Sequence, residues 1–173
     1  QSDKATLQRF LLEESQCIKD VTPKSAVWIV DGMAAVRSLK PKPTYRAWMN
    51  SLIKFVTPKA EMNASEVHIV NDTYLDKSVK NDTRKKRGEP GPRVHLEGYD
   101  QNMLQGSKWH EFLYRNENKT DLIRLFAQFL KEDGCYTGAI PLVFTTGNTA
   151  FQVCNGRVQE MEKCNHEEAD TRL

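Results

Sequence analysis

Four acidic residues have the types and positions that a metal-dependent hydrolase needs. Asp31 follows the apolar run AVWIV, Asp72 follows VHIV and one asparagine, and Glu168 and Asp170 belong to a closing acidic cluster. Carboxylate oxygens suit Mg²⁺ or Mn²⁺, and such ions neutralise a phosphodiester and generate hydroxide near neutral pH. If the fold brings these acids together, they form a candidate catalytic metal site; taken singly, an acid after a strand is better explained as a loop cap or an exposed turn residue.

A basic segment could accompany that site. Residues 77–93 hold seven basic residues against two acids, whereas residues 159–170 hold five acids against one lysine, so the net charge of +2 hides a polarised distribution. The candidate phosphate-binding residues are Lys77, Lys80, Arg84, Lys85 and Arg87. Lysine and arginine would hold the backbone of a nucleic acid, DNA or RNA. The alternatives are a solvated helix face for the basic segment and a self-complementary surface for the two charged segments together.

The histidines and large aromatic residues give weaker signals. His68 lies within an apolar run and is expected to pack in the core, while His166 adjoins the acids and is either a ligand or a helix cap. The aromatic residues recur at core spacing, which favours packing over base stacking; they are Trp28, Trp48, Trp109, Phe126 and Phe129.

The cysteines and the absence of a recognisable leader favour an intracellular location, in the nucleus or cytoplasm. Cys17, Cys135, Cys154 and Cys164 have no metal-ligand spacing, and no charged-then-apolar signal peptide or apolar run of membrane-spanning length is present. We therefore expect reduced thiols and no membrane partner. The four N-x-S/T sequons, at Asn63, Asn71, Asn81 and Asn118, argue the other way, but two of them fall at an expected strand end and in the basic segment.

The elements that must position these residues alternate between strands and helices. Strands are expected over residues 26–30, 67–70 and 141–146, with a hairpin turning at Asn155-Gly156. Helical spacing covers residues 44–56, with Thr44 as N-cap, and residues 109–130, where Asn118 to Asp121 give a start signal. The pattern predicts an α/β domain of three layers with a mostly parallel sheet, whose ligand crevice lies at the carboxyl ends of the strands.

Three segments together resemble the PIN-like superfamily, which includes the flap endonucleases. They are VWIVDG, VHIVNDTYLDKSVKNDTRKKRG and HEEADTRL. The resemblance implies that Asp31 and Asp72 end two strands as metal ligands and that the following bases grip the scissile phosphate. It also implies that Glu168-Ala169-Asp170 matches the E-A-E/D triplet that supplies further ligands. From Val27 to Leu173 the chain is also similar to uncharacterised multi-copy animal proteins, whose motifs resemble its segments DGMAAV, NKTDLI and HEEADTR.

The chain departs from the superfamily after Asp170, because the further pair of acids for a second metal is absent. We therefore expect residues 1–25 to be a helical extension and residues 26–173 to be a PIN-like domain that is incomplete at its C-terminal end. The expected function is a metal-dependent nuclease, weakly active or inactive as these 173 residues. The alternative is a non-catalytic PIN-like domain that binds nucleic acid or a protein, in a mobile-element-associated protein, with the acids kept as helix caps.

Overall fold

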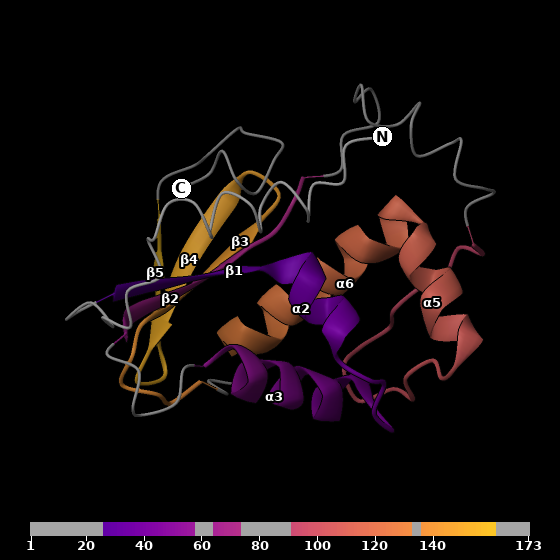
Figure 1. Ribbon diagram of the computed structural model, residues 1–173, viewed down its shortest axis with the longest axis horizontal. Helices are drawn as coiled ribbons and strands as arrows, with labels where there is room; N and C mark the ends of the chain where they lie inside the picture. The colour runs from indigo at the N-terminus through magenta and orange to yellow at the C-terminus, as the bar shows by residue number, and fades with distance from the viewer. Residues whose placement is uncertain (1–25, 58–63, 74–90, 133–135, 162–173) are drawn as a thin grey trace, which may run out of the picture.

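A five-stranded sheet with helices packed against it forms the fold (Figure 1). The computed structural model describes residues 26–57, 64–73, 91–132 and 136–161. The strands lie in chain order across the sheet and span Ala26–Asp31 (β1), Ala64–Val70 (β2), Leu142–Thr146 (β3), Thr149–Cys154 (β4) and Arg157–Glu160 (β5). The helices of these ranges span Gly32–Ser38 (α2), Tyr45–Val56 (α3), Ser107–Tyr114 (α5) and Asn116–Glu132 (α6).

The sheet is mixed, with a parallel half and an antiparallel half. β1 pairs with β2 and β2 with β3 in parallel, whereas β3, β4 and β5 pair antiparallel. Only β4 among these strands runs in the opposite direction. The expected α/β class is therefore confirmed, and the parallel strands are those that carry the candidate acids.

The β4–β5 hairpin confirms the turn expected at Asn155-Gly156. Both residues have positive φ, 49° and 72°, which an Asn-Gly pair adopts at low cost. The turn sets Val153 opposite Val158 and Cys154 opposite Arg157.

One hydrophobic core lies on one face of the sheet. The register places two rows of side chains on that face, and one of them runs through Val30, Ile69, Phe144 and Phe151. All four described helices contribute buried residues to the same core. The described residues thus make two layers, a sheet and a helical layer.

Helix α3 illustrates why the sequence forms these helices. Thr44 caps it by accepting a hydrogen bond from the Ala47 N–H at 3.2 Å, as expected. Apolar residues then recur at helical spacing, and the buried ones include Trp48, Met49, Leu52 and Ile53. The buried stripe packs α3 against the core.

Two sequence expectations were wrong at the level of elements. Helix α6 begins at Asn116, so Asn118 lies inside its first turn instead of preceding it. Trp28 is 40% exposed, because β1 is the terminal strand of the described sheet and core packing ends there. Trp48, Trp109, Phe126 and Phe129 are buried as expected.

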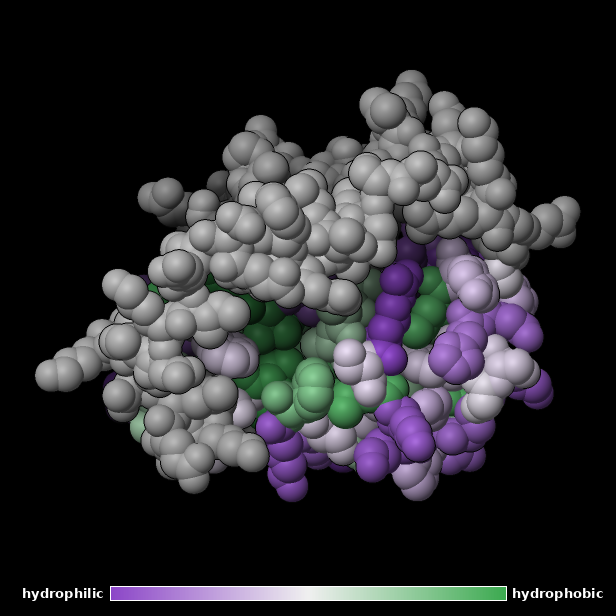
Figure 2. Space-filling view, viewed as in Figure 1, coloured by the Kyte–Doolittle hydropathy of each residue, from purple (hydrophilic) through white to green (hydrophobic). Residues whose placement is uncertain are grey.

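The surface beside β1 is apolar. Val27, Trp28 and Ile29 are all exposed, and Figure 2 shows hydrophobic residues on the visible face between β1 and α3. No helix in the described ranges is long and apolar enough to span a membrane.

Candidate functional site

Asp31 ends the terminal strand and begins a helix. It is the last residue of β1, its side chain is exposed, and its Oδ1 accepts a hydrogen bond from the Ala34 N–H at 2.9 Å. Asp31 is therefore the N-cap of α2. A carboxylate has a second oxygen, so capping leaves acceptor capacity that a cation could use.

Asp72 lies two residues beyond the end of the neighbouring strand. The register pairs Asp31 with Val70, the last residue of β2, so both acids lie at the carboxyl edge of the same parallel pair. We call Asp31 and Asp72 the strand-end pair. Asp72 is half-buried, and the next residue, Thr73, donates its hydroxyl to the Gly147 carbonyl at 3.1 Å.

The other predicted ligands lie outside the described residues. These are Glu168 and Asp170, together with His166 and the phosphate-binding candidates Lys77, Lys80, Arg84, Lys85 and Arg87. The same holds for the expected helical extension at residues 1–25. Within the described ranges, no group of three or more His, Cys, Asp or Glu could hold a metal ion.

The strand-end pair still has the donor chemistry of a hard divalent cation. Mg²⁺ commonly binds through one or two protein carboxylates and completes its coordination with water and substrate phosphate. Two acids at one sheet edge fit that mode better than they fit a structural zinc site, which is built mainly from cysteine and histidine.

His68 does not pack in the core as expected. Its neighbours Val67 and Ile69 take the core face, so alternation along β2 places His68 on the opposite face. There its Nε2 lies 2.7 Å from Glu66 Oε2. His68 is thus half-buried and contacts Glu66 instead of the hydrophobic core.

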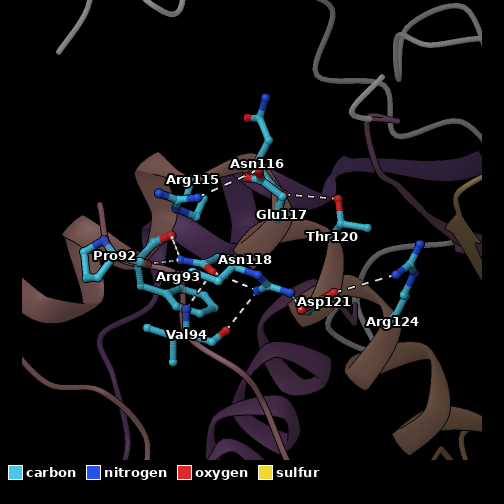
Figure 3. Close-up of polar contacts among 11 residues, drawn as sticks. Pro92, Arg93, Val94, Arg115, Asn116, Glu117, Asn118, Thr120, Asp121 and Arg124 are labelled. Atoms are coloured by element: carbon cyan, nitrogen blue, oxygen red, sulfur yellow. Dashed lines mark hydrogen bonds and ion pairs between the residues drawn. The ribbon is translucent and has the colours of Figure 1, made fainter. Parts of the chain in front are cut away.

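Arg93, at the end of the basic segment, contacts two residues of α6 (Figure 3). Its guanidinium donates to Asn118 Oδ1 at 3.0 Å and pairs with Asp121. Asn118 is 0% exposed, and its amide also donates to the carbonyls of Pro92 and Phe112 at 2.9 and 3.1 Å. We call these contacts the Asn118 cluster. Arg93 is therefore engaged in structure and contributes little to a phosphate grip.

Two of the four sequons are incompatible with a glycan in this fold. Asn71 and Asn118 are buried, at 3% and 0% exposure, and the side-chain nitrogen of each donates to backbone carbonyls. A sugar on either amide would displace those bonds. These two sequons therefore give no support to secretion, whereas Asn63 and Asn81 lie outside the described residues.

One of the four cysteines, Cys154, lies in the part of the chain that the structure describes. Cys154 is a free thiol, and its Sγ lies 3.4 Å from the Ala139 carbonyl. Cys17, Cys135 and Cys164 lie outside the described residues.

Asn71, the residue that connects the end of β2 to β3, was not identified from the sequence. Asn71 lies between β2 and Asp72, and both its backbone N–H and its side chain bond to Thr145 on β3. The sequence does contain a signal, because Asn71 stands between an apolar strand and an acid. A buried asparagine at such a position needs hydrogen-bond partners for its amide.

Comparison of the chain with protein-family models, curated proteins and solved structures found no match in any of the three. The chemistry of the strand-end pair is therefore argued from its residues and their placement.

Proposed function

We propose that the chain is a PIN-like, metal-dependent nuclease domain that hydrolyses nucleic-acid phosphodiesters. The observation that carries the proposal is the strand-end pair: two carboxylates follow adjacent parallel strands at one sheet edge. Ligands of α/β proteins bind outside the carboxyl ends of such strands.

The cation would be Mg²⁺ or Mn²⁺, held by Asp31 and Asp72 and, in the proposal, by Glu168 and Asp170. The ion would supply charge neutralisation and an activated water. The protein's part is to hold the carboxylates in place. The α2 cap does this for Asp31, since its Oδ1 is held by the Ala34 N–H.

The nucleic-acid backbone would lie along the basic segment. Lys77, Lys80, Arg84, Lys85 and Arg87 are the proposed phosphate ligands. Contacts of this kind give binding that weakens steeply with salt. We propose that the protein acts on this substrate in the nucleus or cytoplasm. The proposed PIN-like fold also includes the third layer that the sequence predicts, which the superfamily resemblance implies is made of helices.

The test measures cleavage of end-labelled single-stranded DNA and RNA by the 173-residue chain with and without Mn²⁺. We expect weak, Mn²⁺-dependent cleavage that Asp31→Asn and Asp72→Asn each lower by about 100-fold, as loss of a metal ligand does. Glu111→Gln is the control, because Glu111 is an exposed acid on α5. Because the chain is expected to be weakly active or inactive, Mn²⁺ binding is measured in parallel by electron paramagnetic resonance. Absence of binding, or full cleavage by both Asp variants, would contradict the proposal.

A second candidate function is a non-catalytic binding domain whose acids serve only as caps. The hydrogen bond from Ala34 to Asp31 favours it, because capping alone explains an acid at this position. Asp31→Ser separates the two functions: serine caps as well as aspartate but cannot bind Mg²⁺ or Mn²⁺ as a carboxylate does. If Asp31→Ser keeps full Mn²⁺ affinity, Asp31 is a cap and no ligand.

A further inference from the structure

Asn71 is a buried polar residue at the proposed cation site. It is 3% exposed, its backbone N–H donates to Thr145 Oγ1 at 2.8 Å, and its Nδ2 donates to the Thr145 carbonyl, also at 2.8 Å. Two hydrogen bonds to one residue fix both the backbone and the side chain of Asn71 relative to β3.

The other side of Asn71 contacts the start of α2. A Cβ atom built on Gly32 would lie 2.0 Å from Asn71 Oδ1 and 2.8 Å from its Cγ. Only glycine leaves this space for the amide, so the Gly32 backbone and the Asn71 side chain occupy complementary volumes. We call Gly32, Asn71 and Thr145 the strand-end contact.

The strand-end contact is covalently adjacent to both acids. Asp31 immediately precedes Gly32, and Asp72 immediately follows Asn71. Asp72 is also held from its other side, because Thr73 donates to the Gly147 carbonyl one residue after β3. A shift of Asn71 therefore moves the backbone that carries Asp72 relative to the backbone that carries Asp31.

We propose that Asn71 is a positioning residue that, with Gly32 and Thr145, sets the separation of the Asp31 and Asp72 carboxylates for the cation. This inference rests on the proposed function, because it assigns Asn71 to the same cation site. Mg²⁺ demands near-ideal octahedral geometry, and mutation of residues that orient metal ligands typically lowers metal affinity or activity by about 10- to 100-fold.

The experiment measures Mn²⁺ affinity of the 173-residue chain by electron paramagnetic resonance, with no activity needed. Thr145→Val removes the hydroxyl that accepts from Asn71 and keeps the shape, whereas Thr145→Ser keeps the hydroxyl. We expect Thr145→Val to weaken Mn²⁺ binding about tenfold and Thr145→Ser to stay within about twofold of wild type. Equal affinity of the Val variant and wild type would overturn the positioning role.

A second pair of variants covers the case in which Thr145→Val does not fold. Gly32→Ala introduces a clash with Asn71, and Asn71→Ala in the same chain relieves that clash, leaving a tight contact of 3.2 Å between the new Cβ and the Val70 carbonyl oxygen. We expect the double variant to unfold at a higher temperature than Gly32→Ala alone, with Mn²⁺ affinity about tenfold below wild type. If the folded double variant binds Mn²⁺ as tightly as wild type, the positioning role is overturned. If wild type itself binds no Mn²⁺, the proposed function is overturned, and the positioning role with it.

Discussion

At the residue scale, Asp31 has two tasks that different substitutions can separate. Its carboxylate caps α2 and, in the proposed function, binds a cation. Asparagine and serine are good N-caps, whereas alanine is not. The cap contributes to folding, whereas the negative charge is what the proposed cation site would need.

Asp31→Asn is therefore expected to change the free energy of unfolding by less than about 0.5 kcal/mol, and Asp31→Ala to lower it by about 1 kcal/mol. Urea denaturation without divalent ions measures both. A loss of stability in Asp31→Asn as large as that in Asp31→Ala would show that the charge itself stabilises the fold.

Asn118 is a buried residue that forms hydrogen bonds with the loop before α5. It accepts hydrogen bonds from Arg93 and from the Val94 N–H at 3.0 and 3.1 Å and donates two more. Its amide thus satisfies backbone groups on two segments that are distant in sequence. Removing it would leave several buried polar groups without partners.

Asn118→Ala is expected to lower the free energy of unfolding by about 3 kcal/mol, since each lost bond contributes about 1 kcal/mol and the orphaned groups stay buried. Gln128→Ala on the exposed side of α6 is the control, with an expected change of less than about 0.5 kcal/mol. Chemical denaturation monitored by tryptophan fluorescence measures both. A small effect at Asn118 would mean that water replaces its amide.

At the scale of elements, β1 and β2 differ in how much of their apolar surface is buried. Ile69 on β2 is 1% exposed and belongs to the core, whereas Ile29 on β1 is 50% exposed on the opposite face. The two residues have the same side chain and lie on adjacent strands. The stability cost of truncating each one therefore shows which face of the sheet carries the core.

Ile69→Ala is expected to lower the free energy of unfolding by about 3 kcal/mol, because it removes buried methylenes and leaves a cavity. Ile29→Ala is expected to cost less than about 1 kcal/mol, since half of that side chain is already in water. The two urea midpoints are compared. Equal costs would show that the face of β1 carrying Ile29 is covered in solution.

The elements were easier to predict than their contacts. Apolar runs and the Asn-Gly turn located β1 to β5, because period and turn chemistry are local properties. Asn71 and Asn118 were missed as structural residues because their partners, Thr145 and Phe112 among them, come from other elements. Local signals even misplaced Asn118, which resembles a helix start but lies inside α6. The strand-end pair was predicted because each acid follows its own strand.

At the scale of the whole molecule, aromatic residues join the helices into one core. Tyr45 on α3 packs edge to face with Trp109 on α5, with ring centroids 6.5 Å apart, and Trp109 stacks on Phe112 at 5.4 Å. Burial raises the pKa of Tyr45 from 10.0 to about 12, although the nearby backbone of Leu104 opposes the shift. Global unfolding exposes this phenol, so its ionisation is linked to the stability of the entire fold.

The linkage predicts alkaline destabilisation with a defined window. Between pH 10 and about 12 the unfolded Tyr45 loses its proton while the folded one keeps it. The unfolded state then binds fewer protons, so the free energy of unfolding falls as pH rises, by up to about 1.4 kcal/mol per pH unit. Tyr136, whose pKa is also raised mainly by burial, adds to the decline.

Tyr45→Phe should flatten that decline, because phenylalanine keeps the ring packing and has no proton to lose. We expect wild type to lose at least about 1 kcal/mol more than the variant between pH 9 and pH 11 in urea denaturation. Tyr114→Phe is the matched control, since Tyr114 is exposed on α5. The same slope in wild type and Tyr45→Phe would mean that Tyr45 ionises in the folded protein, and that the core around α3 and α5 admits water.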